Sequence, residues 1–135
     1  MNDPLYQERI VALAKAKTGA GKLANPSRSA RRDNPLCGDR VVLDVRLDEQ
    51  GRIVEVAHQV RGCLLCQASA SALAAVAVGR NAAGIAEVRQ QAERAIGRER
   101  GEAGAPFDAF VPVAGYKSRH ECVLLPLDAL KDALA

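Results

Sequence analysis

A strand pattern followed directly by an apolar helix constrains the fold of this chain more than any other feature. Residues 40–48 alternate valine and leucine with charged side chains, which is the period of a half-buried strand. Residues 48–51 supply a turn, and residues 52–61, rich in valine and isoleucine, return antiparallel to the first strand. The sequence therefore predicts a β-hairpin with one face on a core.

Helical spacing of apolar residues marks four further segments. They are residues 5–17, with Asp3 and Pro4 at their start, and residues 64–78, 81–96 and 122–134. Residues 64–78 are apolar or small almost all round, so this helix is expected to be buried. Pro126 is compatible with the last helix if it lies in the first turn.

The remaining segments are predicted as connections. Residues 18–35 are rich in glycine, proline, serine and arginine without a sustained period, which indicates a surface loop. Residues 97–106 are charged and rich in glycine, and lead to a short segment at 107–113. We therefore expect a single α+β domain, residues 1–135, in which a small antiparallel sheet is covered by helices.

Composition and charge exclude several classes of function. The net charge is only +3, and two Tyr, two Phe and no Trp provide no aromatic set for stacking on bases, so nucleic-acid binding is not expected. The N-terminus lacks the basic and apolar regions of a secretory signal, and no apolar run is long enough to span a membrane. These features predict a cytoplasmic protein that binds no membrane.

Four cysteines are the chemically informative residues. In a cytosolic chain they are expected to stay reduced, which favours metal binding or thiol chemistry over disulfides. Cys37, Cys63 and Cys122 each adjoin a tight turn or a predicted helix start. A helix N-terminus lowers the pKa of a thiol, and so favours the thiolate that binds metal or attacks sulfur.

Asp39 completes a candidate metal site. Gly38 lets the backbone turn between Cys37 and Asp39, so both side chains can face one ion. Three thiolates and one carboxylate form a tetrahedral set suited to zinc, and the hard oxygen ligand is the one that exchanges most readily. We expect the site at one end of the sheet, where the segments that carry these residues converge.

Three sequence blocks carry a resemblance to a known family. They are Asn-Pro-Leu-Cys-Gly-Asp-Arg at residues 34–40, Gly-Cys with the following Gln-Ala-Ser-Ala-Ser-Ala-Leu at 62–73, and Arg-His-Glu-Cys-Val-Leu-Leu at 119–125. In this order they resemble the SufU/IscU/NifU N-terminal family of iron-sulfur assembly proteins. The resemblance implies that Cys37, Cys63 and Cys122 bind zinc or a nascent cluster, with Asp39 as fourth ligand.

Two features resemble the SufU branch of that family. Arg119 lies three residues before Cys122, and an inserted stretch separates Gly79 from Arg119, whereas Glu121 occupies the place where the IscU branch has histidine. The resemblance implies a zinc-dependent sulfur acceptor for a SufS-type cysteine desulfurase, in which Cys37 and Arg119 act catalytically. A scaffold that builds a transient [2Fe-2S] cluster on the same ligands, and passes it to downstream acceptor proteins, is the alternative.

Simpler interpretations remain open for several residues. Cys66 forms a C-x-x-C pair with Cys63, which is found in dithiol redox proteins, although plain core packing also explains it. His120 could replace Asp39 as a ligand, and Arg119 could form an ordinary surface ion pair. His58 is expected to be a hydrogen-bonded strand residue. A closed structural zinc module is a third class of function, but the exchangeable Asp39 ligand argues against it.

Overall fold

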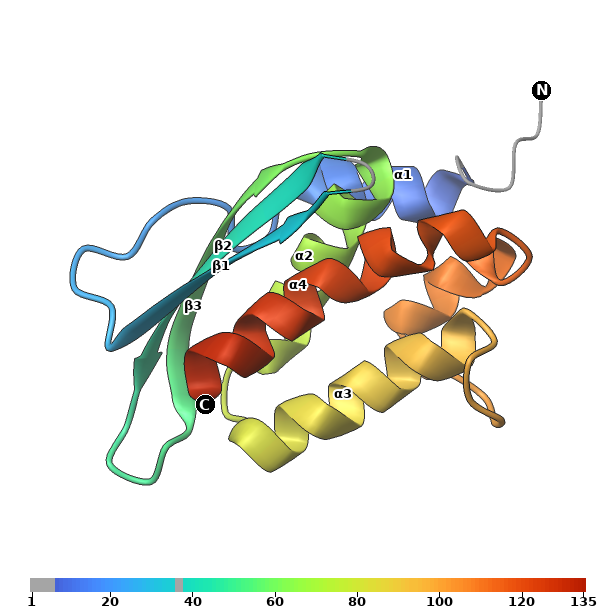
Figure 1. The fold of residues 1–135 in the computed structure, drawn as a ribbon. Helices are drawn as coiled ribbons and strands as arrows, with labels where there is room; N and C mark the ends of the chain where they lie inside the picture. Colours follow the sequence, from blue (N-terminus) through green and yellow to red (C-terminus); the bar gives the residue numbers. More distant parts are fainter. Residues whose placement is uncertain (1–6, 36–37) are drawn as a thin grey trace.

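A three-stranded antiparallel sheet in the order β1-β2-β3 forms the centre of the fold. The structure is a computed structural model, and it describes residues 7–35 and 38–135. The strands are β1 (Arg28–Asn34), β2 (Asp39–Leu47) and β3 (Ile53–Arg61). The helices lie against one face of the sheet (Figure 1). The predicted α+β architecture is thereby confirmed.

The predicted hairpin is formed by β2 and β3. Val41, Leu43 and Val45 point to the helical side and are at most 1% exposed, as their alternation with charged residues predicts. The turn is closed by the N–H of Asp48, which donates to the carbonyl of Arg52 over 2.9 Å. The register therefore follows from the side-chain pattern.

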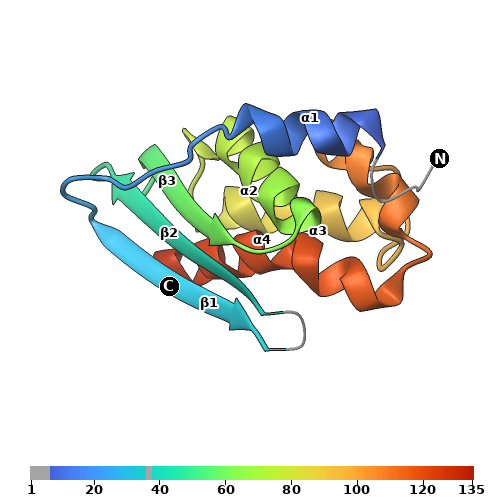
Figure 2. The same cartoon turned by 90° about the horizontal axis from the view of Figure 1, so that it is seen from above.

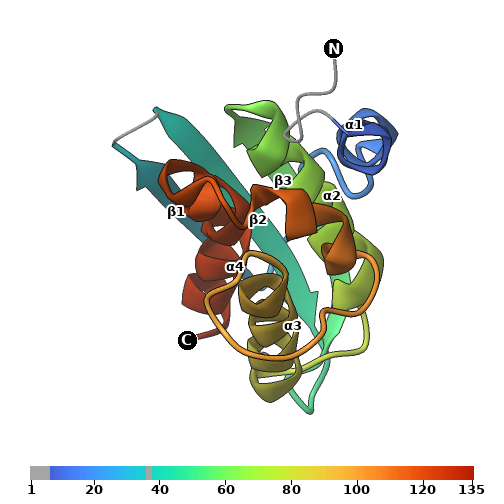
Figure 3. The same cartoon turned by 90° about the vertical axis from the view of Figure 1, so that its right-hand side faces the viewer.

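In the part of the chain that the structure describes, four α-helices cover the sheet in two layers. They are α1 (Glu8–Ala16), α2 (Leu64–Ala77), α3 (Ala82–Ala95) and α4 (His120–Leu134). Helices α2 and α4 contact the strands, while α1 packs on α2 and α3 on α4 (Figures 2 and 3). Helix α2 is buried along most of its length, as predicted. No helix in the described part of the chain is long and apolar enough to cross a membrane.

The inserted stretch between Gly79 and Arg119 contains α3, and the part that follows α3 folds back on the helical layer. It contains two short 3-10 helices, η2 (Phe107–Val113) and η3 (Lys117–Arg119). Phe107 and Phe110 of η2 are buried, and their ring centroids lie 5.9 Å apart. The short segment predicted at residues 107–113 is therefore a core element.

The prediction of a continuous surface loop over residues 18–35 is wrong, because its last part is strand β1. Two of the positions opposite the buried residues of β2 carry arginine, and only Ala30 between them packs against the core. The Nε of Arg32 lies 2.8 Å from a carboxylate oxygen of Asp132 on α4, and Arg28 donates a hydrogen bond to the carbonyl of Ala135. An ion pair and a hydrogen bond thus attach this edge strand to α4, and the apolar alternation that marks a strand in the sequence is absent.

The last helix also begins earlier than predicted. It starts at His120, so Cys122 is its third residue and Pro126 lies in its second turn. Proline has no N–H, so the carbonyl of Cys122 lacks the usual helical hydrogen bond from residue 126. The condition under which Pro126 was expected to be compatible with the helix, a place in the first turn, is therefore not met. The caps expected at Asp3 and Pro4 fall outside the described residues.

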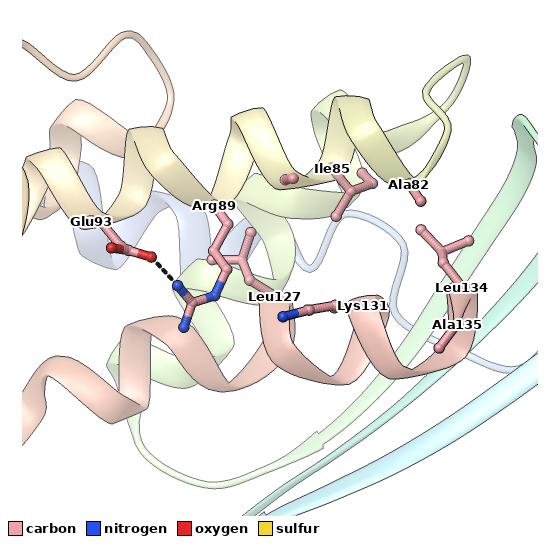
Figure 4. A pocket seen from close by; sticks show the side chains of 9 residues that line it. Ala82, Ile85, Arg89, Glu93, Leu127, Lys131, Leu134 and Ala135 are labelled. Atoms are coloured by element: carbon pink, nitrogen blue, oxygen red, sulfur yellow. Dashed lines mark hydrogen bonds and ion pairs between the residues drawn. The ribbon is translucent and has the colours of Figure 1, made fainter.

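An apolar groove lies between α3 and α4, away from Asp39, Cys63 and Cys122 (Figure 4). Ile85 and Leu127 line it, and Arg89 pairs with Glu93 at one end. Its volume is about 420 Å³. Of the predicted metal ligands, the three that the structure describes, Asp39, Cys63 and Cys122, do not line this groove.

Candidate metal centre

Asp39 is the first residue of β2 and is almost completely buried, with 2% of its surface exposed. Its Oδ1 accepts a hydrogen bond of 3.0 Å from the backbone N–H of Cys63, and its Oδ2 lies 3.4 Å from the Cys63 Sγ. The carboxylate therefore joins the start of β2 to the start of α2. Because Oδ1 is engaged by this N–H, Oδ2 is the oxygen better placed to bind a metal, and Asp39 is suited to be a monodentate ligand.

Gly62 makes this arrangement possible. A Cβ atom at residue 62 would lie 2.4 Å from Asp39 Oδ1 and 2.7 Å from its Cγ, which is closer than atoms can pack. In the sequence this glycine stands out only as the first residue of the block at 62–73. Its role depends on a contact with the side chain of Asp39, which is distant in the sequence, so the residue pattern carries no signal for it.

Cys63 is the N-cap of α2 and is half-buried. A hydrogen bond with the Cys122 thiol, followed in size by one from the backbone N–H of Cys66, lowers the pKa of Cys63 from 9.0 to about 7. Burial and the neighbouring Asp39 carboxylate oppose this shift. A substantial fraction of Cys63 is thus thiolate at neutral pH, which is the form that binds metal.

Cys122 lies in the first turn of α4 and is fully buried. Val123, the residue after Cys122, attaches this turn to α2, because its carbonyl accepts a hydrogen bond of 2.5 Å from the hydroxyl of Ser69. Ser69 belongs to one of the three sequence blocks, but the residue pattern does not explain why a serine is needed there. Its hydrogen bond fixes the separation of the helices that carry Cys63 and Cys122.

The three side chains converge on one point. One ligand atom each from Asp39, Cys63 and Cys122 lies within 4.8 Å of the other two. Sulfur atoms around a tetrahedral zinc ion, at about 2.3 Å from the metal, are about 3.8 Å apart. Shifts of about 1 Å or less would therefore bring these atoms to bonding distance, and two thiolates with one carboxylate suit zinc or iron.

Cys37, the fourth predicted ligand, lies outside the described residues. In the sequence it is separated from Asp39 by Gly38 alone. Its part in the metal site stays a prediction. A small hollow of about 260 Å³ adjoins this region and is lined by Asn34, Gly38 and Asp39, among others.

His120 and Cys66 are not members of the ligand group within the described part of the chain. The Nδ1 of His120 accepts from the Nε of Arg98 over 3.3 Å, and its Nε2 lies 3.1 Å from the carbonyl of Ala114. Both ring nitrogens therefore bind the inserted stretch. Cys66 is fully buried in the core, as the packing interpretation expects.

Arg119 lies at the N-cap of α4, three residues before Cys122, and its side chain is exposed. It forms no ion pair or hydrogen bond of its side chain within the described ranges. The surface ion pair considered for this residue is therefore not formed, and its guanidinium is available to an anionic partner.

The chain matches a protein-family model described as the NifU-like N terminal domain over residues 5–134. The IscU iron-sulfur cluster assembly scaffold protein of Thermotoga maritima is 27% identical over 96% of this chain and 92% of its own length. The bifunctional protein NifU/MnmA of Rubrobacter xylanophilus is 33% identical over 68% of this chain, which spans only 19% of that relative.

A solved structure shares the fold over nearly the whole chain. It is that of a putative iron-sulfur cluster assembly scaffold protein for the SUF system from Fervidobacterium islandicum AW-1. The two chains are 32% identical, with a TM-score of 0.88 and 97% of each chain covered.

Proposed function

The chain belongs to the NifU-like N-terminal domain family, and we propose that it works in iron-sulfur cluster assembly as a zinc-dependent sulfur acceptor for a SufS-type cysteine desulfurase. The observation that carries the proposal is the convergence of Asp39, Cys63 and Cys122 within 4.8 Å. The names of the relatives support the assembly function. The mixed carboxylate and thiolate donors support a site that exchanges ligands.

The proposed ligand set is Cys37, Asp39, Cys63 and Cys122. Zinc bound there would keep the cysteines deprotonated at neutral pH. In this set Asp39 contributes its Oδ2, because its Oδ1 accepts a hydrogen bond from the N–H of Cys63. Cys63 and Cys122 are fixed by the helices that carry them, which leaves Cys37, beside Gly38 in the sequence, as the residue we assign to sulfur chemistry.

The sulfur step requires no external oxidant or reductant. The Cys37 thiolate attacks the terminal sulfur of a persulfide on the desulfurase. The bond between that sulfur and the desulfurase cysteine breaks, and its electron pair leaves with the desulfurase thiolate. Cys37 then carries the persulfide, and the number of sulfur–sulfur bonds is unchanged.

We assign Arg119 to charge compensation at this site. Three thiolates and one carboxylate exceed the charge of one divalent ion, and Arg119 is exposed three residues before Cys122. Arginine remains protonated and offers several donors to an anionic group. Arg119→Ala should slow sulfur acceptance without lowering thermal stability, whereas Arg100→Ala, also at an exposed position, should change neither.

A scaffold for a nascent [2Fe-2S] cluster is the second candidate function. The relatives named as scaffolds, and the same thiolate ligands, support it. In that case the cluster is cargo that is built and handed on. The dithiol redox alternative has less support, because Cys66, in the first turn of α2, is fully buried. Both remaining functions need reduced thiols, so we place the protein in the cytoplasm.

Two measurements on protein purified without oxygen separate these functions. One zinc per colourless chain supports sulfur acceptance, and iron with a brown colour supports the scaffold. After incubation with a cysteine desulfurase and cysteine, mass spectrometry should find persulfide on Cys37. Persulfide mainly on Cys63, Cys66 or Cys122 contradicts the assignment. Cys66→Ala is the matched control, and should keep both metal and transfer.

A further inference from the structure

The outer edge of β3 is only partly paired. Strand β3 is an edge strand of the sheet, and the segment that follows α1 pairs with it in parallel through a bridge between Ala20 and His58. The N–H of His58 donates to the carbonyl of Gly19 over 2.8 Å, and the N–H of Gly21 donates to the carbonyl of His58 over 2.9 Å. A parallel partner therefore occupies this edge for one residue of β3.

The parallel pairing ends at His58 and does not extend to Val60, two residues further along β3. Backbone groups alternate in direction along a strand, so the N–H and the carbonyl of Val60 point to the same side as those of His58. In the register of Ala20 and His58, residue 22 would lie opposite Val60. The segment that follows α1 no longer pairs with β3 at this position, because the N–H of Leu23 donates to the side chain of Asp44 on β2 over 3.3 Å.

A cavity of about 430 Å³ lies where the partner strand is missing. Val60, Gly21 and Gln67 are among the residues that line it. Val60 forms no backbone hydrogen bond outside the sheet ladder within the described ranges. The space is thus bordered by an unused donor and acceptor of a strand edge, which are the groups that hold an added strand.

The positive charge of Lys17 in the cavity lining favours a negatively charged segment as the bound partner. Among the described residues, Lys17 is the only charged one in its lining, which otherwise consists of alanine, glycine, valine, glutamine and the ring of His58. Since no acidic side chain of residues 7–35 or 38–135 lines the cavity, a carboxylate on the occupant meets Lys17 without repulsion from these residues. An acidic side chain on an extended backbone therefore matches both the backbone groups and the charge.

We infer that the edge of β3 at Val60 binds an extended, acidic segment of a partner protein, which continues the parallel pairing that the chain itself begins at His58. Val60 lies three residues before Cys63, so the bound segment places its parent protein beside the metal centre. Only this last step rests on the proposed function. The binding itself is independent of sulfur transfer.

The test uses the full chain, labelled with ¹⁵N, and the acetylated and amidated peptide Val-Glu-Val-Glu-Val as the probe. Binding should shift the amide resonances of Val60 and Lys17 and slow hydrogen exchange at Val60. The same peptide with its second and fourth amides N-methylated should bind at least tenfold more weakly. A peptide with lysine in place of glutamate should also bind at least tenfold more weakly.

Variants of Val60 and Lys17, each with a matched control, test whether the peptide binds at the edge of β3. Val60→Pro removes the outward N–H but leaves the bonds to β2, which come from Gln59 and Arg61, and should weaken binding at least tenfold. Val60→Thr keeps the N–H and should bind as the unaltered chain does. Lys17→Glu should weaken binding, whereas Lys131→Glu on α4 should not.

Three results would overturn the inference. Equal binding of the N-methylated and unmodified peptides would show that backbone groups of the peptide are not recognised. Unchanged binding by Val60→Pro would remove the edge from the site. Protection of Val60 that grows with protein concentration, in the absence of peptide, would assign the edge to a second copy of the chain.

Discussion

The backbone N–H of Cys63 is hydrogen-bonded to Oδ1 of Asp39 at 3.0 Å, so one carboxylate both joins two elements of the fold and faces the metal position. Its second oxygen is 3.4 Å from the Cys63 Sγ. Structural and chemical roles are therefore divided between two oxygens of the same side chain. This division makes the two roles separable by substitution.

Asp39→Asn and Asp39→Ala should separate them. Asparagine keeps a carbonyl oxygen for the N–H of Cys63 but removes the charge, so metal affinity should fall while the unfolding free energy changes little. Alanine also leaves the buried N–H unpaired, which costs about 1 to 3 kcal/mol. Zinc titration and urea denaturation of both metal-free variants measure the two effects. Equal destabilisation of the two variants would contradict the structural role.

Gly62→Ala should damage the metal site from outside the ligand set. The added methyl group would overlap Asp39 Oδ1 at 2.4 Å, so the carboxylate must move away from Cys63. We expect weaker zinc retention in a competition with a chelator. Gly115→Ala is the matched control, because a Cβ at Gly115 meets nothing within 4 Å. Equal retention by the two variants would show that Asp39 is not a ligand.

Metal affinity should depend on pH through Cys63. The pKa of its thiol in the folded protein is lowered to about 7, so below that pH a proton must leave before metal binds. Affinity should therefore fall as pH decreases through about 7. In the metal-free protein, stability from the lowered pKa is present above pH 9 and is lost as pH falls to about 7.

Alkylation with iodoacetamide reports the same group directly. Cys63 is half-buried, whereas Cys66 and Cys122 are buried, so mass spectrometry can follow its modification separately. The rate in metal-free protein should rise with a midpoint near pH 7. A midpoint near the ordinary thiol value of 9.0 would mean that Cys122 does not stabilise the Cys63 thiolate.

His58 should make the fold sensitive to acid. Burial lowers its pKa below 6.5, and its Nδ1 has no hydrogen-bond partner within the described ranges. The unfolded chain therefore binds a proton more readily than the folded one, and stability should fall as pH decreases below about 6.5. His58→Gln offers an amide donor to the carbonyl of Thr18 but does not titrate.

Urea denaturation of both proteins at about pH 7.5 and at about pH 5.5 measures this difference. The unaltered chain should lose more stability on acidification than His58→Gln. The same loss in both proteins would show that other groups cause the acid sensitivity.

The sequence predicted the elements whose periodicity comes from apolar packing. The hairpin of β2 and β3 and the buried helix α2 belong to this class. Strand β1 was missed because Arg28 and Arg32 attach it to α4 by polar contacts, which leave no alternation of apolar residues to detect. The start of α4 was placed too late because the exposed and polar residues before Cys122 carry no helical pattern.

In the candidate site, too, some residues were predictable from the sequence and others were not. Asp39, Cys63 and Cys122 were predicted from their residue types and from the blocks that contain them, and the fold brings them together. The roles of Gly62 and Ser69 are not predictable from the sequence, because they depend on contacts between residues far apart in the chain. A missing methyl group beside Asp39 and a hydrogen bond to Val123 are visible only in three dimensions.

The spacing of the ligands along the chain imposes an order on their appearance during synthesis. Asp39 and Cys63 lie at the two ends of one hairpin and can meet as soon as it has left the ribosome. Cys122 is made only after α3 and the inserted stretch, so the growing chain presents an incomplete set of donors for much of translation. Capture of a metal by the three described ligands is therefore a late event, which follows the arrival of α4.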